Sequence, residues 1–472
     1  MSQQKVLSIQ EKRIAEERKT KKVIYTFPNR ATKLLEKVKG TKPQIDVERG
    51  LYFTESFQQT EGESLNLRWA KALYHYAEHA KVYIEEGQLL AGRSGKLGRY
   101  GILYPELDGD ILGDAIEKLP ERESSPFNIS EEDAKIVKEK IQPYWEGKTY
   151  HEDLVKAFPK ETKRLTYNED GTSRFIVNET SSFRSSIQWV HDYEVVLEKG
   201  FSGIKKEAED RLHQLDEDSA VDTLEKKPFL EATIITCDAI ILWANRHAEL
   251  AEKLAEKESD ETKKQELLTI AKNSRRVPEF PPENFYQAVQ SQWYVQMFSR
   301  IEQKTGTVIS NGRMDQYLYP YYKKDLEAGI ITEKQAQELL ECMWVAMSEF
   351  IDLYLSETGG AFNEGYAHWE AVTIGGVDKE GNDAVNDLTY LLLKSKRDFP
   401  LNYPDLAARI HTLSPNRYLH EVAETIKEGS GFPKLINDDE VIPLLLAKGA
   451  KLEEAYDYSV SGCSECRMPN RD

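Results

Sequence analysis

Short β-like runs alternate with long helical segments along this chain, and that alternation most restricts its fold. Residues 229–246 are apolar on most faces, as expected of a buried helix, and a second apolar helix is expected at 282–298. A short β run then begins at Thr307 and breaks at Asn311-Gly312. No internal repeat or low-complexity segment interrupts the pattern. Strands separated by helices predict an α/β fold.

Composition argues against several classes of protein. The chain has 472 residues, which is ample for a large core, and its net charge of -18 argues against nucleic-acid binding. No apolar run is expected to reach the length of a membrane span, and the first residues lack an apolar signal region. Four cysteines do not make a disulfide framework. We therefore expect a cytoplasmic protein with no nucleic-acid or membrane partner.

The last stretch of the chain concentrates reactive side chains, with Gly462, Cys463 and Glu465 close together. If this stretch is extended, side chains at i and i+2 point to the same face, about 7 Å apart. Cys463 and Glu465 then address one substrate, while Ser464 and Cys466 point the other way. Gly462 lets the backbone bend just before the thiol. The pattern predicts a nucleophile or radical carrier beside a general base.

Cys463 and Cys466 also form a C-x-x-C pair, which admits other interpretations. That spacing occurs in zinc sites and in redox dithiols. A four-ligand zinc site needs a second pair, but Cys237 and Cys342 lie in separate helical stretches. A thioredoxin-type dithiol is expected near the start of a small βαβ domain rather than at the end of a long chain. An inert, buried Cys463 remains a further interpretation, because free cysteine is often buried.

Arg184 and Gln188 form a second candidate site. They are separated by four positions, so on a helix they share one face. The guanidinium and the amide together offer N–H donors suited to an oxyanion. Spacing alone favours a plain surface pair over a binding site. His191 lies near the same face and is interpreted as a satisfied core or surface histidine rather than a catalyst.

The sequence Gly462-Cys463-Ser464-Glu465 resembles the active-site signature of the glycyl radical enzymes, the relatives of pyruvate formate-lyase. The resemblance extends over residues 60–472 and is dense after residue 282, as in the run GRMDQYLYPYY from Gly312 to Tyr322. It implies a ten-stranded α/β barrel in a helical shell, of which this chain supplies the first half-barrel and the cysteine loop. The implied regions are a helical shell at about 1–300, barrel strands with connecting helices at about 301–455, and the cysteine loop at 456–472.

The same resemblance implies a radical mechanism. In the family, a radical S-adenosylmethionine activating enzyme places a radical on a glycine in an R-V-x-G-[YF] motif, and the radical passes to the loop cysteine, here Cys463. That motif does not occur in these residues. We therefore expect the C-terminal glycine radical domain to be absent from the sequence, and the chain to be inactive alone. Homodimerisation and an activating-enzyme partner are implied, with no other bound cofactor and no metal; a microcompartment is a possible location.

The resemblance also implies a substrate class. Glu465 after Cys463 is typical of the family's eliminases and decarboxylases, with Glu465 as general base. Arg184, Gln188 and Trp369 resemble the sulfonate pocket of the family's sulfite-lyases, although alternation alone gives Trp369 equal odds of pointing inward or outward. The expected reaction is radical C–S cleavage of isethionate to acetaldehyde and sulfite. The alternatives are the same reaction on 2,3-dihydroxypropane-1-sulfonate, a diol dehydratase or choline lyase, and a non-catalytic binding or scaffold subunit.

Overall fold

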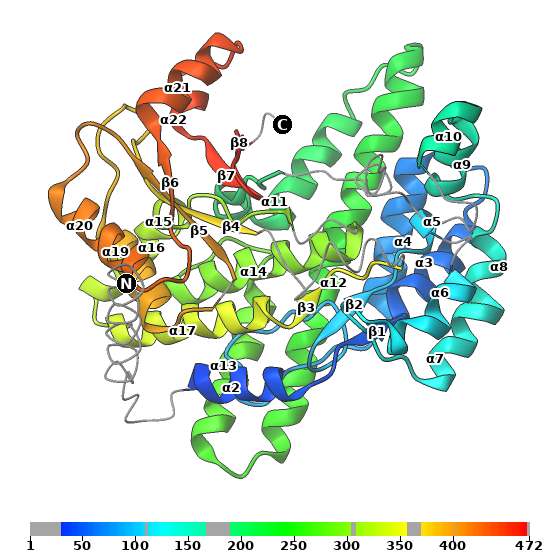
Figure 1. Ribbon diagram of the computed structural model, residues 1–472, viewed down its shortest axis with the longest axis horizontal. Coiled ribbons are helices and arrows are strands. Elements are labelled where there is room, and N and C mark those ends of the chain that lie inside the picture. Colours follow the sequence, from blue (N-terminus) through cyan, green and yellow to red (C-terminus); the bar gives the residue numbers. More distant parts are fainter. Residues whose placement is uncertain are drawn as a thin grey trace, which may run out of the picture.

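Long helices lie between an N-terminal helical region and a C-terminal sheet (Figure 1). The computed structural model describes residues 30–108, 112–166, 189–303, 308–355, 370–401 and 403–469. The strands form two three-stranded sheets and one two-stranded hairpin within these ranges. The cysteine loop belongs to the hairpin, so the C-terminal sheet and the helices that support it determine the position of the candidate site.

The N-terminal region is a layer of helices around a small parallel sheet. Its strands β1 (Gln44–Asp46), β2 (Tyr100–Ile102) and β3 (Phe350–Ile351) pair in that order. A strand from the second half of the chain thus completes the sheet that the N-terminal region begins. The surrounding helices are α2 (Arg30–Gly40), α3 (Glu48–Gln59), α4 (Leu65–His79), α5 (Pro105–Asp108), α6 (Leu112–Lys118), η1 (Leu119–Glu121), α7 (Glu131–Ile136), η2 (Val137–Ile141), α8 (Gln142–Trp145), α9 (Tyr150–Ala157) and α10 (Lys160–Thr166).

The longest helix, α12 (Lys227–Lys257), crosses the middle of the molecule. It packs against α4, α11 (Tyr193–Leu212) and α13 (Glu261–Arg276), and its buried face is rich in alanine, which lets neighbouring helices approach closely. Together with η3 (Asp222–Lys226), it is long and apolar enough to cross a membrane by length and composition. The expectation that no run reaches that length is therefore wrong. Packing against three helices accounts for the apolar face.

Helix α14 (Phe285–Glu302) packs against the segment that enters the C-terminal sheet, and it is buried on nearly every side. Its N-cap Asn284 accepts a hydrogen bond from the backbone N–H of Gln287. Buried amides along the helix bond to neighbouring backbone: Gln290 exchanges two hydrogen bonds with Ala91, and the Gln296 amide donates to the carbonyl of Ile309. These bonds satisfy polar side chains that burial would otherwise penalise, and the Gln296 bond joins α14 to the segment that enters the C-terminal sheet.

The C-terminal sheet is parallel and follows the order of the chain. Strands β4 (Ala371–Gly375), β5 (Asp405–Ile410) and β6 (Lys434–Asn437) pair in sequence, and parallel bridges Val190–Ser310 and Gly312–Val372 extend the sheet beyond β4. Helices alternate with these strands, as predicted: α15 (Met314–Tyr317), α16 (Tyr319–Glu327), α17 (Glu333–Met347), α19 (Asp387–Asp398), α20 (Asn416–Lys427), α21 (Asp438–Ala447) and α22 (Leu452–Tyr456). The α/β prediction is confirmed, and this sheet is the predicted first half-barrel.

The two faces of this sheet carry different side chains. Val372, Ile374, Leu406 and Ala408 point into the main hydrophobic core, which they share with α19 and α20. The residues between them, among them Ala371 and Ala407, face the hairpin formed by β7 (Ser459–Ser461) and β8 (Glu465–Arg467). Small side chains on this second face leave space for the hairpin to lie directly on the sheet.

Candidate functional site

The candidate cysteine lies in the turn of the β7–β8 hairpin. Ser461 pairs with Glu465, so Gly462, Cys463 and Ser464 form a three-residue turn. Gly462 has φ +58°, a left-handed conformation that costs glycine little. The extended backbone that the i and i+2 argument took as its condition does not occur at Cys463, because the chain reverses there. Glu465 is the first residue of β8, so the thiol and the carboxylate come from the turn and from the strand that follows it.

Polar contacts hold strand β7 against the sheet. The backbone N–H of Val460 donates to Thr373 Oγ1 at 2.9 Å, and the Ser461 hydroxyl donates to the carbonyl of Val308 at 2.8 Å. The side chain of Val460 packs between Ala371 and Ala407. Each contact joins the hairpin to a strand or bridge segment of the half-barrel, so the sheet determines where the turn lies.

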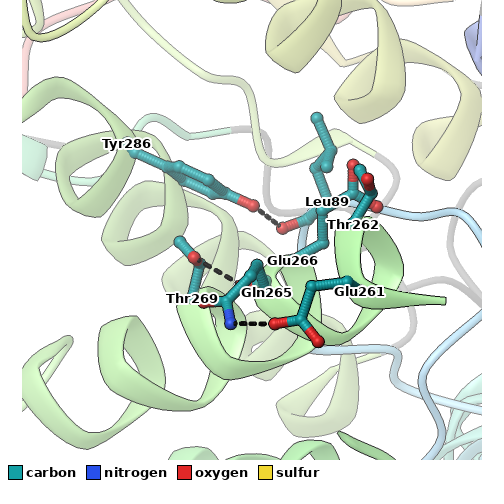
Figure 2. A pocket seen from close by; sticks show the side chains of 7 residues that line it. All are labelled: Leu89, Glu261, Thr262, Gln265, Glu266, Thr269 and Tyr286. Atoms are coloured by element: carbon teal, nitrogen blue, oxygen red, sulfur yellow. Dashed lines mark hydrogen bonds between the residues drawn. The ribbon is translucent and has the colours of Figure 1, made fainter. Parts of the chain in front are cut away.

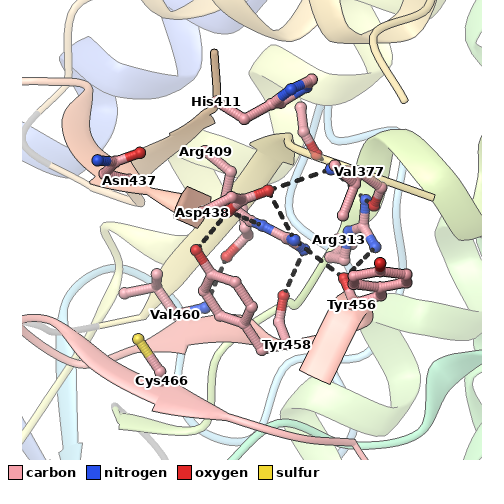
Figure 3. Close-up of polar contacts among 12 residues, drawn as sticks. Arg313, Val377, Arg409, His411, Asn437, Asp438, Tyr456, Tyr458, Val460 and Cys466 are labelled. Carbon is pink, nitrogen blue, oxygen red and sulfur yellow. Dashed lines mark hydrogen bonds and ion pairs between the residues drawn. The ribbon is translucent and has the colours of Figure 1, made fainter. Parts of the chain in front are cut away.

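Two buried arginines hold the base of the hairpin (Figure 3). Arg409 on β5 donates to the carbonyls of Tyr458 and Tyr456, at 2.8 and 2.9 Å. Arg313 donates to Asp457 Oδ1 at 3.1 Å, and also to the carbonyl of Val377 at 2.7 Å. Arg313, in the run that begins at Gly312, therefore joins the base of the hairpin to the end of β4.

The environment of Cys463 favours the thiol over the thiolate. The side chain is exposed, yet burial of the sulfur and then the nearby Glu465 carboxylate raise its pKa above the ordinary value of 9.0, while Lys434 opposes the rise. The Glu465 carboxylate accepts a hydrogen bond from the backbone N–H of Ser464 at 3.0 Å. An S–H group that stays protonated near neutral pH suits hydrogen-atom exchange better than nucleophilic attack, because attack requires the thiolate.

The other cysteines do not join Cys463 in a metal or dithiol site. Cys466 lies half-buried on β8, where it packs near Tyr458. Cys237 and Cys342 are buried in α12 and α17, and all four cysteines are free. Within the described ranges, the group that could hold a metal ion is His75, Glu78 and His79 on α4, and it contains no cysteine.

Three predicted pocket residues, Arg184, Gln188 and Trp369, lie outside the described residues, so their roles stay predictions. Trp189 and Glu370, which directly follow Gln188 and Trp369, are described. The carbonyl of Trp189 accepts a hydrogen bond from the Ser461 hydroxyl at 3.3 Å. Glu370, which directly precedes β4, is fully buried.

His191 is a partly buried histidine with a hydrogen-bond partner, which agrees with the predicted core or surface role. Its Nε2 lies 2.5 Å from the Ser299 hydroxyl of α14. Burial lowers its pKa to about 4, so the ring is neutral at physiological pH. Its imidazole packs edge-on against Tyr193. These contacts give His191 a structural role.

Lys434 and Asp405 are site residues that the sequence did not indicate. The Lys434 ammonium donates to the carbonyls of Gly462 and Cys463 and to the Asp405 carboxylate. Both residues are the first of their strands, at the same end of the sheet. Asp405 lies two residues before Ala407 on β5, and Lys434 pairs with Ala407, so both side chains share the hairpin face of the sheet. This alternation is the sequence signal that could have indicated them.

A surface pocket lies elsewhere, between α13 and residues Leu89 and Tyr286 (Figure 2). It has a volume of about 390 Å³. The charged residues that line it are Glu261 and Glu266, so it offers no cation to a sulfonate. Helix α13 lies at the lower edge of Figure 1, away from the hairpin.

Comparison with known proteins identifies the family. The sequence profile described as pyruvate formate lyase-like matches residues 21–472. The chain belongs to this family of glycyl radical enzymes. The family membership agrees with the half-barrel, the position of the cysteine hairpin and the run from Gly312 to Tyr322.

Curated relatives and solved structures in the family cover nearly the whole chain. It is 66% identical over 445 residues to isethionate sulfite-lyase of Desulfovibrio desulfuricans and 65% identical over 446 residues to that of Bilophila wadsworthia; each match covers 94% of this chain and 54% of the relative. The glycerol-bound B12-independent glycerol dehydratase from Clostridium butyricum superposes with a TM-score of 0.86 at 34% identity, covering 93% of this chain and 55% of that structure. The chain thus spans about half the length of the curated relatives it matches.

Proposed function

We propose that this chain is the part of a glycyl radical C–S lyase that carries its reactive thiol, and that the enzyme cleaves isethionate to acetaldehyde and sulfite. The observation that carries the proposal is the hairpin turn that presents Cys463 beside Glu465. Support for the substrate comes from the identity of about two thirds shared with isethionate sulfite-lyases.

The proposed reaction begins at Cys463. As a thiyl, its sulfur abstracts a hydrogen atom from the hydroxyl-bearing carbon of isethionate, which leaves an α-hydroxy carbon radical and a thiol. Glu465 removes the hydroxyl proton, which such radicals release far more readily than the parent alcohol. The C–S bond then breaks, and its electron pair leaves with sulfite. A positioned general base contributes about 10²–10⁴-fold to such a step.

The remaining fragment is the radical of acetaldehyde, with its unpaired electron on the terminal carbon. Transfer of the hydrogen atom from Cys463 gives acetaldehyde and restores the thiyl. The proton held by Glu465 leaves with sulfite, so the products together contain all the atoms of isethionate. The raised pKa of Cys463 fits this cycle, because the thiol must carry its hydrogen between the two transfers.

The family's glycyl radical supplies the unpaired electron to Cys463. We propose that a radical S-adenosylmethionine enzyme installs it, and that these residues turn over only together with a segment carrying the R-V-x-G-[YF] glycine motif, which they do not contain. We also propose that Arg184, Gln188 and Trp369 bind the sulfonate. The exposed Cys463 turn leaves the thiol open to a radical donor and to substrate.

The test is sulfite release by the complete gene product, activated anaerobically and offered isethionate and 2,3-dihydroxypropane-1-sulfonate separately. We expect sulfite from isethionate and little from the larger sulfonate. A sample with a glycyl radical that releases no sulfite from isethionate would overturn the proposed substrate. The variant Cys463→Ala serves as the blank, because it lacks the thiol but keeps the hairpin contacts made through the backbone.

A further inference from the structure

Lys434 makes a three-point contact beneath the cysteine turn. Its ammonium Nζ lies 2.6 Å from the carbonyl oxygen of Cys463 and 3.0 Å from that of Gly462. The third partner is Asp405 Oδ2, at 2.7 Å. Lys434 pairs in register with Ala407 of the neighbouring strand, so its side chain lies on the hairpin face of the sheet.

These contacts use the full donor capacity of the ammonium. A lysine ammonium has three N–H donors and no acceptor, and each of the three acceptors lies within hydrogen-bond distance. Asp405 balances the positive charge, so the cation has a fixed partner beside the turn. Lys434 therefore has no donor left for a sulfonate oxygen. Its position suits a residue that holds the protein backbone rather than one that binds substrate.

The turn depends on contacts of this kind. The strand pairing of the hairpin ends at Ser461 and Glu465, and the three residues between them reach beyond the paired strands. Gly462 has no side chain to pack, and Cys463 is exposed. Lys434 bonds the carbonyls of Gly462 and Cys463, which flank the α-carbon of Cys463, so it fixes the backbone from which the Cys463 side chain projects.

We propose that Lys434 is a positioning residue that sets the reach of the Cys463 sulfur toward substrate, with Asp405 as its anchor. The inference deepens the proposed function and rests on it only for the effect on turnover. A displacement of about 1 Å in a reacting group costs up to about 100-fold in rate. The two strands that carry Lys434 and Asp405 are part of the half-barrel, so the rigid sheet transmits its geometry to the turn.

The first test uses the 472-residue chain and needs no turnover. Lys434→Met removes the donors at similar length, and Lys434→Arg keeps the positive charge. Lys427→Met is the matched control, because Lys427 is an exposed lysine on α20 whose partner is Glu424. Hydrogen exchange at the amides of residues 462–465 should become about tenfold faster in Lys434→Met, as expected when a contact of modest strength is lost, and stay unchanged in the control.

Site-resolved alkylation of Cys463 against pH is the second readout. The charged groups that face the thiol are Glu465, Asp405 and Lys434, and of these only Lys434 lowers its pKa. Lys434→Met should therefore move the midpoint of alkylation about one pH unit upward. Lys434→Arg should keep the midpoint near that of the unsubstituted chain. An unchanged midpoint in Lys434→Met would show that the Lys434 ammonium does not lie beside the Cys463 sulfur.

The third readout is kinetic and uses the complete, activated protein. We expect Lys434→Met to lower kcat for isethionate about 10- to 100-fold, with KM changed by less than about twofold, since the ammonium has no donor free for substrate. A raised KM at unchanged kcat would overturn the positioning role. So would unchanged exchange and alkylation in Lys434→Met. If isethionate is not the substrate, the unsubstituted protein is also inactive, and exchange and alkylation alone decide the inference.

Discussion

Arg409 and Asp438 form a fully buried pair with two parallel hydrogen bonds. Arg409 Nε lies 2.8 Å from Asp438 Oδ1, and Nη2 lies 2.9 Å from Oδ2. The same guanidinium donates to the carbonyls of Tyr456 and Tyr458, and the Tyr458 hydroxyl donates to Asp438. The pair thus joins β5, the start of α21 and the base of the cysteine hairpin. Stability and the position of the turn depend on the same contact.

Asp438→Asn should destabilise the protein by about 3–5 kcal/mol, because it leaves the Arg409 charge buried without its counter-charge. The change keeps the shape of the side chain, so lost packing does not explain the effect. The measurement is the shift of the urea unfolding midpoint. The control Glu424→Gln breaks the exposed pair with Lys427 and should cost less than about 1 kcal/mol. Equal costs for both variants would contradict the prediction.

Glu465→Gln should abolish turnover while leaving radical formation intact. The amide keeps the size of the carboxylate but cannot accept the hydroxyl proton, so we expect kcat to fall about 10²–10⁴-fold. Sulfite release reports turnover, and electron paramagnetic resonance of the activated, complete protein reports the radical. Glu440→Gln, an exposed change on α21, is the matched control. Full activity in Glu465→Gln would remove the base assignment.

Much of the fold could be predicted from sequence because the signals are local. The apolar stretch at 282–298 predicted α14, and the alternation of strands and helices predicted the α/β class. Pairings between distant strands carry no such signal. β2 and β3 each have at most three residues, and nothing in either run indicates that Tyr100 pairs with Phe350. The apolar residues 229–246 likewise predicted a buried helix, which is part of α12.

The part of the candidate site whose reactive side chains are close together in the sequence could be predicted. Gly462, Cys463 and Glu465 stand together, so a reactive loop could be predicted there. The pairing of β7 with β8 around it could not, because hairpin register depends on contacts between the strands. Lys434 was not predictable in this way. Its partners are backbone carbonyls of residues 462 and 463 and a carboxylate on another strand, and a lysine near an acidic stretch resembles a surface residue.

Stability should fall as the pH drops from 6.5 to 4, in part because of His247. This histidine is fully buried in α12, where burial lowers its pKa to about 4 from the ordinary 6.5. The unfolded chain therefore binds the proton more readily in this range. The stability linked to the neutral ring is complete above pH 6.5 and is lost as the pH falls, by about 3 kcal/mol in all.

His247→Leu removes this titration and keeps an apolar side chain in the core. The difference in urea midpoint between His247→Leu and the unsubstituted chain should thus change with pH between 6.5 and 4, and stay constant above 7. The comparison isolates His247 from other buried groups, such as Asp46, whose pKa is raised to about 6 by burial. His213→Gln, at an exposed histidine, should give a pH-independent difference. A constant difference for His247→Leu would refute the assignment.

Gly462→Ala should loosen the hairpin without unfolding the sheet. The residue has φ +58°, where an alanine costs about 1–2 kcal/mol. Because Lys434 bonds the Gly462 carbonyl, relief of that strain by turning the peptide would also break this contact. Amide exchange across β7 and β8 should accelerate about 5- to 30-fold. Gly462→Asn should show a smaller effect, because asparagine tolerates the left-handed region. Gly40→Ala, where an added Cβ meets open space, should leave the hairpin unchanged. Equal exchange in the alanine and asparagine variants would show that the conformation of Gly462 does not hold the turn.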